Sequence, residues 1–242
     1  MVHPILFKIG GLTFYTHGIL AVLGIILCAV IVNRLARAEQ LDRTFLFDNI
    51  VWAILIGIIG ARLTYFFLYR DQFSSTSQIF YLQNGGLVSF GGFIPAAIAF
   101  YLLWKFQKQP VAKWFDLLSI GFVAGMILGR LGNLMAGEYA GIASTSRFAI
   151  DGVLPINAFE GIWVAIVALI LYRIYRRTKH RIDGMIVWLC VFLYGVGRFV
   201  IDFWRDEKII FWHLNLSQIT SAALAIIALI IIMRAVISER KK

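Results

Sequence analysis

Three arginines lie inside apolar segments of the chain, at Arg62, Arg130 and Arg198. An arginine near the middle of a bilayer costs about 2.5–3.5 kcal/mol, so such a residue normally faces a bundle interior or a wet cavity. The guanidinium group presents a planar fork of donors that suits bidentate binding of phosphate better than the point charge of lysine. These residues therefore predict a site that binds an anion within a membrane.

Two acids and a histidine are expected near the arginines. Glu160 and His17 each lie near the start of an apolar segment, and Asp202 follows Arg198 by one helical turn. One interpretation is that the acids neutralise the arginines in structural ion pairs. Three arginines against two embedded acids leave one positive charge, however, and lipid phosphate is the common anion at a membrane surface. We therefore expect a pocket for a lipid headgroup.

Seven apolar stretches are long enough to carry these side chains across a bilayer. Of the 242 residues, 60% are hydrophobic and only 15% are charged, and the mean hydropathy is +0.82. About 20 apolar residues in a helix span the hydrocarbon core. The expected fold is all-α, a polytopic membrane protein with seven transmembrane helices in a single domain over residues 1–242. The spans are predicted near residues 17–33, 49–69, 87–104, 115–135, 155–172, 184–203 and 215–233.

The distribution of lysine and arginine predicts how these helices are oriented. Alternate segments between the spans hold 15 of these residues, against 5 in the other set of segments. Cytoplasmic loops are enriched in positive charge, so we expect the N-terminus outside and the C-terminus in the cytoplasm. Counting back from the outer helix ends then puts each embedded arginine roughly 8–12 Å below the outer surface. Asp116 alone lies at an inner helix end.

The composition also indicates what the protein does not bind. The net charge is +10, but the basic residues alternate with apolar runs instead of forming one face, so no nucleic acid is expected. Cys28 and Cys190 both lie inside apolar runs, which gives no support to a disulfide or a zinc site. Histidine, cysteine and carboxylate residues show no ligand-like spacing, so neither a metal nor an organic cofactor is expected.

Two segments place further polar groups beside the arginines. Tyr194 precedes Arg198 by one turn, and Arg205 lies close by in the sequence. The run GRLGNLMAGEYAG at 129–141 puts Asn133 one turn beyond Arg130, and Glu138 just past an expected helix break. These groups are candidates for contacts with the hydroxyls of a headgroup.

Glycines in two places have alternative interpretations. Gly129 and Gly132 would let a substrate approach the backbone, or would allow close helix packing. Packing is favoured because Gly121, Gly125 and Gly129 form overlapping steps of small residues. The glycine-bracketed segment 85–92 either enters the membrane irregularly, with amides facing an anion, or is a plain loop.

The sequence resembles the prolipoprotein diacylglyceryl transferases of bacterial membranes. GRLGNLMAGEYAG at 129–141 is similar to that family's signature of the form GRxGNxxxGExxG. Further similarity is found in GARLTYFFLY at 60–69, NGGLVSFGG at 84–92, YGVGRFVIDFWR at 194–205 and LSQI at 216–219. The resemblance runs in order through nearly the whole chain and also implies seven helices with the N-terminus outside.

The resemblance implies a reaction and its partners. The family moves a diacylglyceryl group from phosphatidylglycerol to the thiol of a lipobox cysteine in a secreted prolipoprotein, and releases glycerol phosphate. A protein of this kind would be a multi-pass protein of the bacterial cytoplasmic (inner) membrane, with its active site toward the outer leaflet. Its expected partners are phosphatidylglycerol, the lipobox peptide and the bilayer.

The resemblance also implies roles for individual residues. Arg130 and Arg198 match the family's essential arginines and would bind phosphate and stabilise charge on the leaving group. Other matches are the signature residues and an arginine of the second span, namely Asn133, Glu138, Gly141 and Arg62. We expect Asn133, Glu138 and Tyr194 to orient headgroup hydroxyls. We expect Arg62, Glu160 and Asp202 to organise the electrostatics.

The chain departs from the family pattern at two positions that concern proton transfer. The family commonly has a histidine in the glycine-flanked segment, where this chain has Phe90. The family's first span usually has a tyrosine before its glycine, where this chain has His17. A free thiol has a pKa of about 8.5 and needs a base to become nucleophilic. We propose His17 as that proton acceptor or as a headgroup ligand; the alternative is a histidine that only satisfies the start of its helix.

Two further departures concern the acceptor. The family's HPSQLYE run is represented here by LPINAFE at 154–160, and the outer segment 136–154 is short for the family. Two alternatives to the transferase therefore stay open. One is a phospholipid transporter or scramblase, and the other is a lipid-binding homologue with altered or absent catalysis.

Overall fold

The computed structural model describes residues 3–10, 12–81, 89–178 and 182–239. In these residues it has seven α-helices, one at each of the predicted ranges. Several helices extend one or two turns past their apolar stretch into charged residues, which are good helix formers; Arg37 and the pair Arg176 and Arg177 lie in such last turns. The helices are α1 Thr16–Ala38, α2 Arg43–Leu68, α3 Ser89–Phe106, α4 Val111–Met135, α5 Ile156–Arg177, α6 Met185–Ile201 and α7 Leu216–Glu239.

Six helical segments of the described chain are long and apolar enough to cross a membrane. They are Thr16–Ala38, Leu46–Leu68, Val111–Met135, Ile156–Arg177, Met185–Trp204 and Leu216–Glu239. In α3 the described apolar part is Ile94–Phe106, and Pro95 lies near its start. Many large apolar side chains are exposed, such as Trp52 at 60% and Ile226 at 59%. This surface suits contact with lipid, so the chain is a multi-pass membrane protein.

Short antiparallel hairpins, which the sequence analysis did not predict, accompany the helices. They pair β1 Ile5–Ile9 with β2 Leu12–Tyr15, β3 Ala140–Ala143 with β4 Val153–Pro155, and β5 Ile209–Phe211 with β6 Leu214–Asn215. Strands of two to five residues are too short to show a period of two in the sequence. An isolated β-bridge pairs Gly141, in the segment between α4 and α5, with Arg205, in the segment between α6 and α7. Three 3₁₀ turns complete the elements, at Arg70–Gln72, Thr76–Phe80 and Asp202–Trp204.

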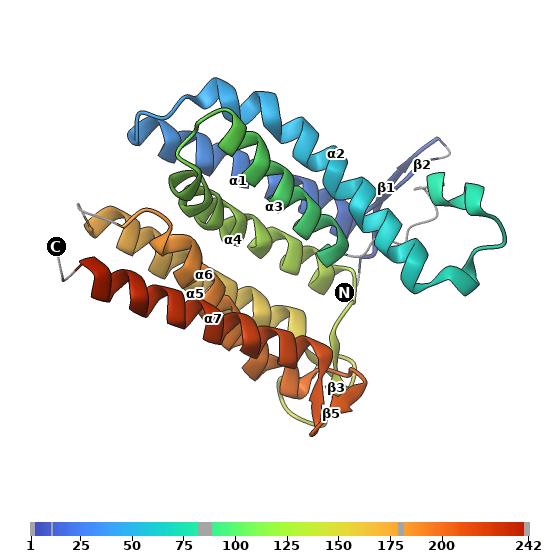
Figure 1. The fold of residues 1–242 in the computed structure, drawn as a ribbon. Coiled ribbons are helices and arrows are strands. Elements are labelled where there is room, and N and C mark those ends of the chain that lie inside the picture. Colours follow the sequence, from blue (N-terminus) through green and yellow to red (C-terminus); the bar gives the residue numbers. More distant parts are fainter. Residues whose placement is uncertain (1–2, 11, 82–88, 179–181, 240–242) are drawn as a thin grey trace. The chain divides into compact units, whose positions relative to one another are not determined.

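The chain divides into two compact units, and each is described by itself. The first unit is Met1–Leu35 with Ala112–Lys242, and the second is Ala36–Val111. In the first unit α6 packs between α5 and α7 (Figure 1). The second unit contains the packed pair α2 and α3. The single domain over residues 1–242 stays a prediction.

Glycines bring helices of the first unit into close contact. A Cβ atom on Gly125 would lie 2.4 Å from the Gly24 carbonyl oxygen, and one on Gly121 would lie 2.9 Å from that of Cys28. A Cβ on Gly132 would lie 3.0 Å from the Cα of His17. The packing interpretation is therefore confirmed for three of the four glycines of α4. Gly129 differs, since a Cβ there would meet no other atom within 4 Å.

Asp116, near the start of α4, has a structural role away from Arg130, which lies near the end of the same helix. Its carboxylate accepts hydrogen bonds from the backbone amides of Gly184 and Val187, each at 2.8 Å. Gly184 is the N-cap of α6. Free amides at a helix N-terminus and the positive end of the helix dipole both stabilise a carboxylate. Asp116 therefore caps α6 from the neighbouring helix α4.

Candidate functional site

Glu160 forms the centre of a cluster of charged side chains in the first unit. It lies in the second turn of α5 and is 4% exposed. One carboxylate oxygen, Oε2, lies 3.0 Å from Nη1 of Arg130 on α4. The other, Oε1, pairs with the guanidinium groups of Arg198 on α6 and Arg205 just after it. One buried acid therefore holds three arginines from three segments of the chain.

Asp202 supports the same arginines from the other side. It begins the 3₁₀ turn that follows α6, and its side chain is fully buried. Its Oδ2 lies 3.1 Å from Nε of Arg198, and its Oδ1 accepts a hydrogen bond from Nε of Arg205 at 2.9 Å. The spacings i, i+4 and i, i+3 place these groups on one face. The predicted pairing of Arg198 with Asp202 is therefore confirmed.

The buried part of the cluster keeps a positive charge after these pairings. Three arginines and two buried acids leave a net charge of +1, which the carboxylate of Glu207 balances at the rim, 3.9 Å from Arg198 and 3.7 Å from Arg205. Burial lowers the pKa of the Arg205 guanidinium, but the adjacent Glu160 and Asp202 raise it by more, so it lies above its ordinary value. The side chains of Arg130 and Arg198 remain 20% and 17% exposed. Their edges therefore reach the surface, where an anion can approach.

Neutral side chains complete the coordination of the two helical arginines. Asn157, three residues before Glu160, accepts a hydrogen bond from Nη1 of Arg130 at 3.2 Å. Its amide nitrogen donates to the backbone carbonyl of Glu138. Ser217, on α7, accepts a hydrogen bond from Nε of Arg198 at 2.9 Å. Each guanidinium group is therefore held by a neutral side chain as well as by a carboxylate.

His17 and Glu138 form a second, more exposed pair beside this cluster. The two atoms Nδ1 of His17 and Oε1 of Glu138 lie 3.8 Å apart, and the side chains are 47% and 54% exposed. Tyr15 lies next to the imidazole, with ring centroids 5.9 Å apart. Because the Glu138 carbonyl also binds Asn157, the pair is linked to Arg130 through one side chain. An accessible imidazole next to a carboxylate is a group that can accept a proton.

Three other predicted residues lie within the same unit. Tyr194 is half-buried one turn before Arg198, and Asn133 is half-buried one turn after Arg130. Among the described residues, neither side chain has a hydrogen-bonding partner. Gly141 is buried, and a Cβ there would lie 2.2 Å from the Leu154 carbonyl oxygen. The pairing of β3 with β4 thus requires glycine at position 141, because any side chain there would displace β4.

Arg62 lies in the second unit, where it binds a turn of the backbone. It is 5% exposed, and its guanidinium donates to the carbonyl oxygens of Gln78, Ile79 and Tyr81 at 2.8–3.0 Å. The ring of Phe73 lies 5.3 Å from its Cζ. These contacts anchor the turn that follows α2. The expected grouping of Arg62 with Glu160 and Asp202 stays a prediction, because each unit is described by itself.

Some groups of the cluster were not assigned by sequence reasoning. Asn157 carried a signal, since i, i+3 spacing places it on the Glu160 face of α5. Arg205 and Ser217 lie in two of the runs that resemble the family, at 194–205 and 216–219, but no role was predicted for either, and no local pattern distinguished Glu207. The side chain of Phe90 and residues 85–88 of the glycine-bracketed segment lie outside the described residues, and residues 89–92 begin α3. The part of the chain that the structure describes contains no group of three or more metal-ligating side chains.

The chain is similar to one family of known proteins over almost its full length. The family description "Prolipoprotein diacylglyceryl transferase" matches residues 4–234. The phosphatidylglycerol–prolipoprotein diacylglyceryl transferase of Clostridium novyi is 31% identical over 253 residues, covering 98% of each chain. Its namesake from Finegoldia magna is 30% identical over 230 residues, covering 93% of this chain and 92% of that one. Phosphatidylglycerol–prolipoprotein diacylglyceryl transferase 1 of Clostridium perfringens is 27% identical over 254 residues, covering 99% of this chain and 97% of that one.

Proposed function

The chain belongs to the prolipoprotein diacylglyceryl transferase family, a family of transferases, and we propose that it carries out that reaction. It would transfer the diacylglyceryl group of phosphatidylglycerol to a lipobox cysteine thiol. The observation that carries the proposal is the Glu160 cluster, in which three arginines share one buried carboxylate. Such a cluster offers guanidinium forks to a phosphate, and its buried part retains a charge of +1.

In the proposed reaction the thiolate attacks the glyceryl carbon that carries the phosphate. A carbon–sulfur bond forms, the carbon–oxygen bond breaks, and glycerol phosphate leaves with the electron pair. Arg130 and Arg198 would turn from carboxylate to phosphate oxygens and stabilise the charge that develops on the leaving group. Glu160 and Asp202 would hold the arginines in place before the lipid enters. The arginines are thus gathered at one place before the lipid binds, and the phosphate replaces carboxylate contacts that they already make.

The remaining predicted residues suit recognition of the headgroup. Asn133 and Tyr194 lie one turn from Arg130 and Arg198, and neither side chain is hydrogen-bonded to another described residue. A glycerol headgroup has two hydroxyls that would hydrogen-bond to such groups. Glu138 would accept from a hydroxyl as well as facing His17. Gly141 would act indirectly, by permitting the connection that places Arg205.

We propose His17 as the acceptor of the thiol proton, with Glu138 stabilising the resulting imidazolium. The distance of 3.8 Å between Nδ1 and Oε1 and the exposure of both side chains support this role. Replacing His17 with alanine should reduce transfer at pH 7 by about 100-fold or more and leave the amount of folded protein unchanged. His17→Tyr restores the residue usual in the family and serves as the matched control. Full activity in the alanine variant would exclude the role.

The proposed topology has seven spans, an external N-terminus and a cytoplasmic C-terminus. The excess of lysine and arginine in alternate connections supports it. It places the protein in the bacterial inner membrane with the arginine cluster toward the outer leaflet, which is where a secreted prolipoprotein presents its thiol. Single-cysteine variants at Ser146 and Lys108, labelled by a membrane-impermeant maleimide in intact cells, test the two faces. Labelling at Ser146 alone supports this orientation, and labelling at Lys108 alone contradicts it.

The reaction is tested with the purified protein in nanodiscs. Phosphatidylglycerol and a lipobox peptide are supplied together, and both glycerol phosphate and the lipidated peptide are measured. We expect equal amounts of the two products, and their loss in Arg130→Ala and Arg198→Ala. A lipobox peptide with serine in place of cysteine is the substrate control.

One observation favours a second candidate, a lipid-binding homologue without turnover. All three clustered arginines are ion-paired in the structure, as a purely structural network would require. This candidate predicts selective retention of phosphatidylglycerol without release of glycerol phosphate. A transporter or scramblase would instead move labelled lipid between leaflets, again without release. The nanodisc assay, run beside a leaflet-exchange assay, separates all three.

A further inference from the structure

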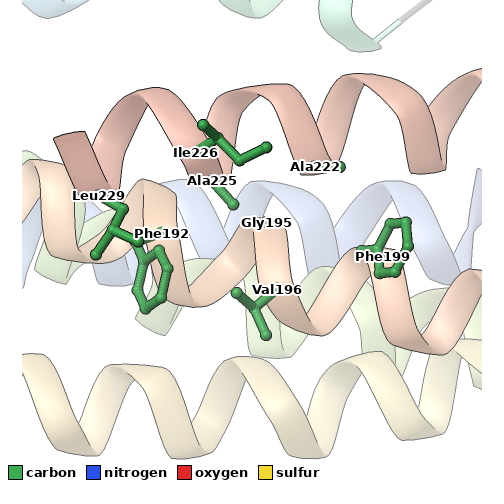
Figure 2. Close-up of a pocket in the computed structure, with 8 residues that line it drawn as sticks. All are labelled: Phe192, Gly195, Val196, Phe199, Ala222, Ala225, Ile226 and Leu229. Atoms are coloured by element: carbon green, nitrogen blue, oxygen red, sulfur yellow. The ribbon is translucent and has the colours of Figure 1, made fainter.

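An apolar groove lies between α6 and α7, next to the arginine cluster. Figure 2 shows Phe199 and Ala222 at one end of the groove and Phe192 and Leu229 at the other. Its volume is about 220 Å³. The walls are formed by Phe192, Val196 and Phe199 of α6 and by Ala222, Ile226 and Leu229 of α7.

Small residues create this groove by bringing the two helices close together at its floor. A Cβ on Gly195 would lie 2.9 Å from the Ser221 carbonyl oxygen and 3.2 Å from the Cβ of Ala225. Ala225 is 7% exposed and lines the floor with Gly195. The walls, by contrast, reach the surface, with Val196 at 36% and Leu229 at 39% exposed. The result is a narrow channel that is open along its length toward the lipid-facing side.

One end of the groove, at Phe199 and Ala222, lies within about two helical turns of the contact between Arg198 and Ser217. Phe199 directly follows Arg198, whose Nε donates to Ser217 on α7 at 2.9 Å. Ala222 lies five residues after Ser217, which is about 7.5 Å along the helix. From Ala222 to Leu229 the groove extends about 10 Å further from the cluster. Arginines at one end and a wholly apolar channel beyond them match the polarity of a phospholipid.

We propose that this groove binds an acyl chain of the phosphatidylglycerol molecule whose phosphate is held by Arg130 and Arg198. The inference rests on the proposed function, because that function places the phosphate at the arginines. A single acyl chain is narrow enough to enter. A helical segment has a diameter of about 10 Å and could only lie over the mouth of the groove, whereas a single acyl chain can fill it to the floor at Gly195 and Ala225.

Binding is tested first by photolabelling, which does not depend on turnover. The probe is phosphatidylglycerol with a diazirine near the end of one acyl chain, added to the wild-type protein in nanodiscs. We expect the label on residues 192–199 and 222–229, competed by unlabelled phosphatidylglycerol and not by phosphatidylcholine. Ala222→Phe fills the groove and should reduce this labelling at least about tenfold. Ala223→Phe, on the next and exposed position of α7, is the matched control and should keep it.

The same variants have a kinetic signature if the protein is a transferase. Ala222→Phe should raise KM for long-chain phosphatidylglycerol about tenfold with little change in kcat, and should leave KM for a short-chain analogue unchanged. Selective labelling of the groove without turnover would reject the proposed function and keep the acyl site. Turnover with label spread evenly over the lipid-facing helices, or unchanged labelling in Ala222→Phe, would overturn the acyl site.

Discussion

Asp116 and Glu160 are buried acids in one helical unit, each 4% exposed, and their partners differ in kind. Asp116 accepts hydrogen bonds from backbone amides that cannot move away without unwinding α6. Glu160 is paired with guanidinium groups on flexible side chains. Near Asp116 the hydrogen-bond donors are backbone amides of α6, which are fixed by the helix and cannot turn toward a phosphate. A phosphate that enters near Glu160 finds donors that can turn toward it.

We propose that this difference separates a structural acid, Asp116, from an acid of the substrate site, Glu160. Both acids look alike as isolated carboxylates in apolar segments, and both are costly to bury without partners. At the Asp116 site the negative charge of one carboxylate is balanced by the positive end of one helix dipole, so no charge remains to attract an anion. The Glu160 site carries three cations for two buried acids, with Glu207 only at its rim, and we propose that it accepts an anion. The predictions below test this contrast, in order of decreasing effect.

Replacing an arginine of the cluster with lysine should have the largest effect on activity. Lysine keeps the charge but loses the planar fork that binds two phosphate oxygens. We expect Arg198→Lys to lower kcat/KM for phosphatidylglycerol at least about 100-fold, measured by release of glycerol phosphate. Its content of folded protein, judged by gel filtration, should stay close to that of the wild type. Wild-type activity in Arg198→Lys would show that charge alone suffices.

Neutralising Glu160 should come next. Glu160→Gln keeps the shape of the side chain and leaves three arginines close together with Asp202 as their one buried acid and Glu207 at the rim. Breaking a buried ion pair in this way costs about 3–5 kcal/mol, so we expect a lower midpoint of thermal unfolding together with reduced activity. Added phosphatidylglycerol should recover part of the lost stability, because its phosphate replaces the missing charge. If the lipid gives no more protection than it gives the wild type, the arginines do not exchange partners.

Asp116→Asn should affect stability and spare the chemistry. The amide has only one accepting oxygen, so it keeps one of the two backbone hydrogen bonds and leaves the other N–H without its acceptor, which costs about 1–3 kcal/mol. We expect a lower thermal midpoint and an unchanged kcat/KM per folded molecule. A specific loss of activity in this variant would contradict the separation of the two ends.

Glu207→Gln should have the smallest effect. Glu207 is 36% exposed and lies 3.7–3.9 Å from two arginines, and exposed ion pairs contribute about 0–1 kcal/mol. Removing its charge makes the rim more positive, so we expect KM for phosphatidylglycerol to fall by less than about threefold. An increase in KM would mean that Glu207 positions the arginines and does not merely compete with the phosphate.

Much of the helical framework and part of the site could be predicted from the sequence. Apolar length placed the helices, since the bilayer imposes that length directly. The i, i+4 spacing predicted the contact of Arg198 with Asp202, because helical geometry alone brings them together. Residue type could not reveal that Asp116 caps α6, since this contact joins positions 68 residues apart. For the same reason the backbone partners of Arg62, 16 to 19 residues away, were not foreseen.

Selective lipid binding tests the central claim most directly, that the arginines around Glu160 release a carboxylate to bind a lipid phosphate. The measurement is native mass spectrometry of the purified protein with equal amounts of phosphatidylglycerol and phosphatidylcholine. We predict that the wild type and Asp116→Asn retain phosphatidylglycerol selectively, and that Arg130→Ala and Arg198→Ala lose this selectivity. Equal retention of phosphatidylglycerol by all four proteins would contradict the account.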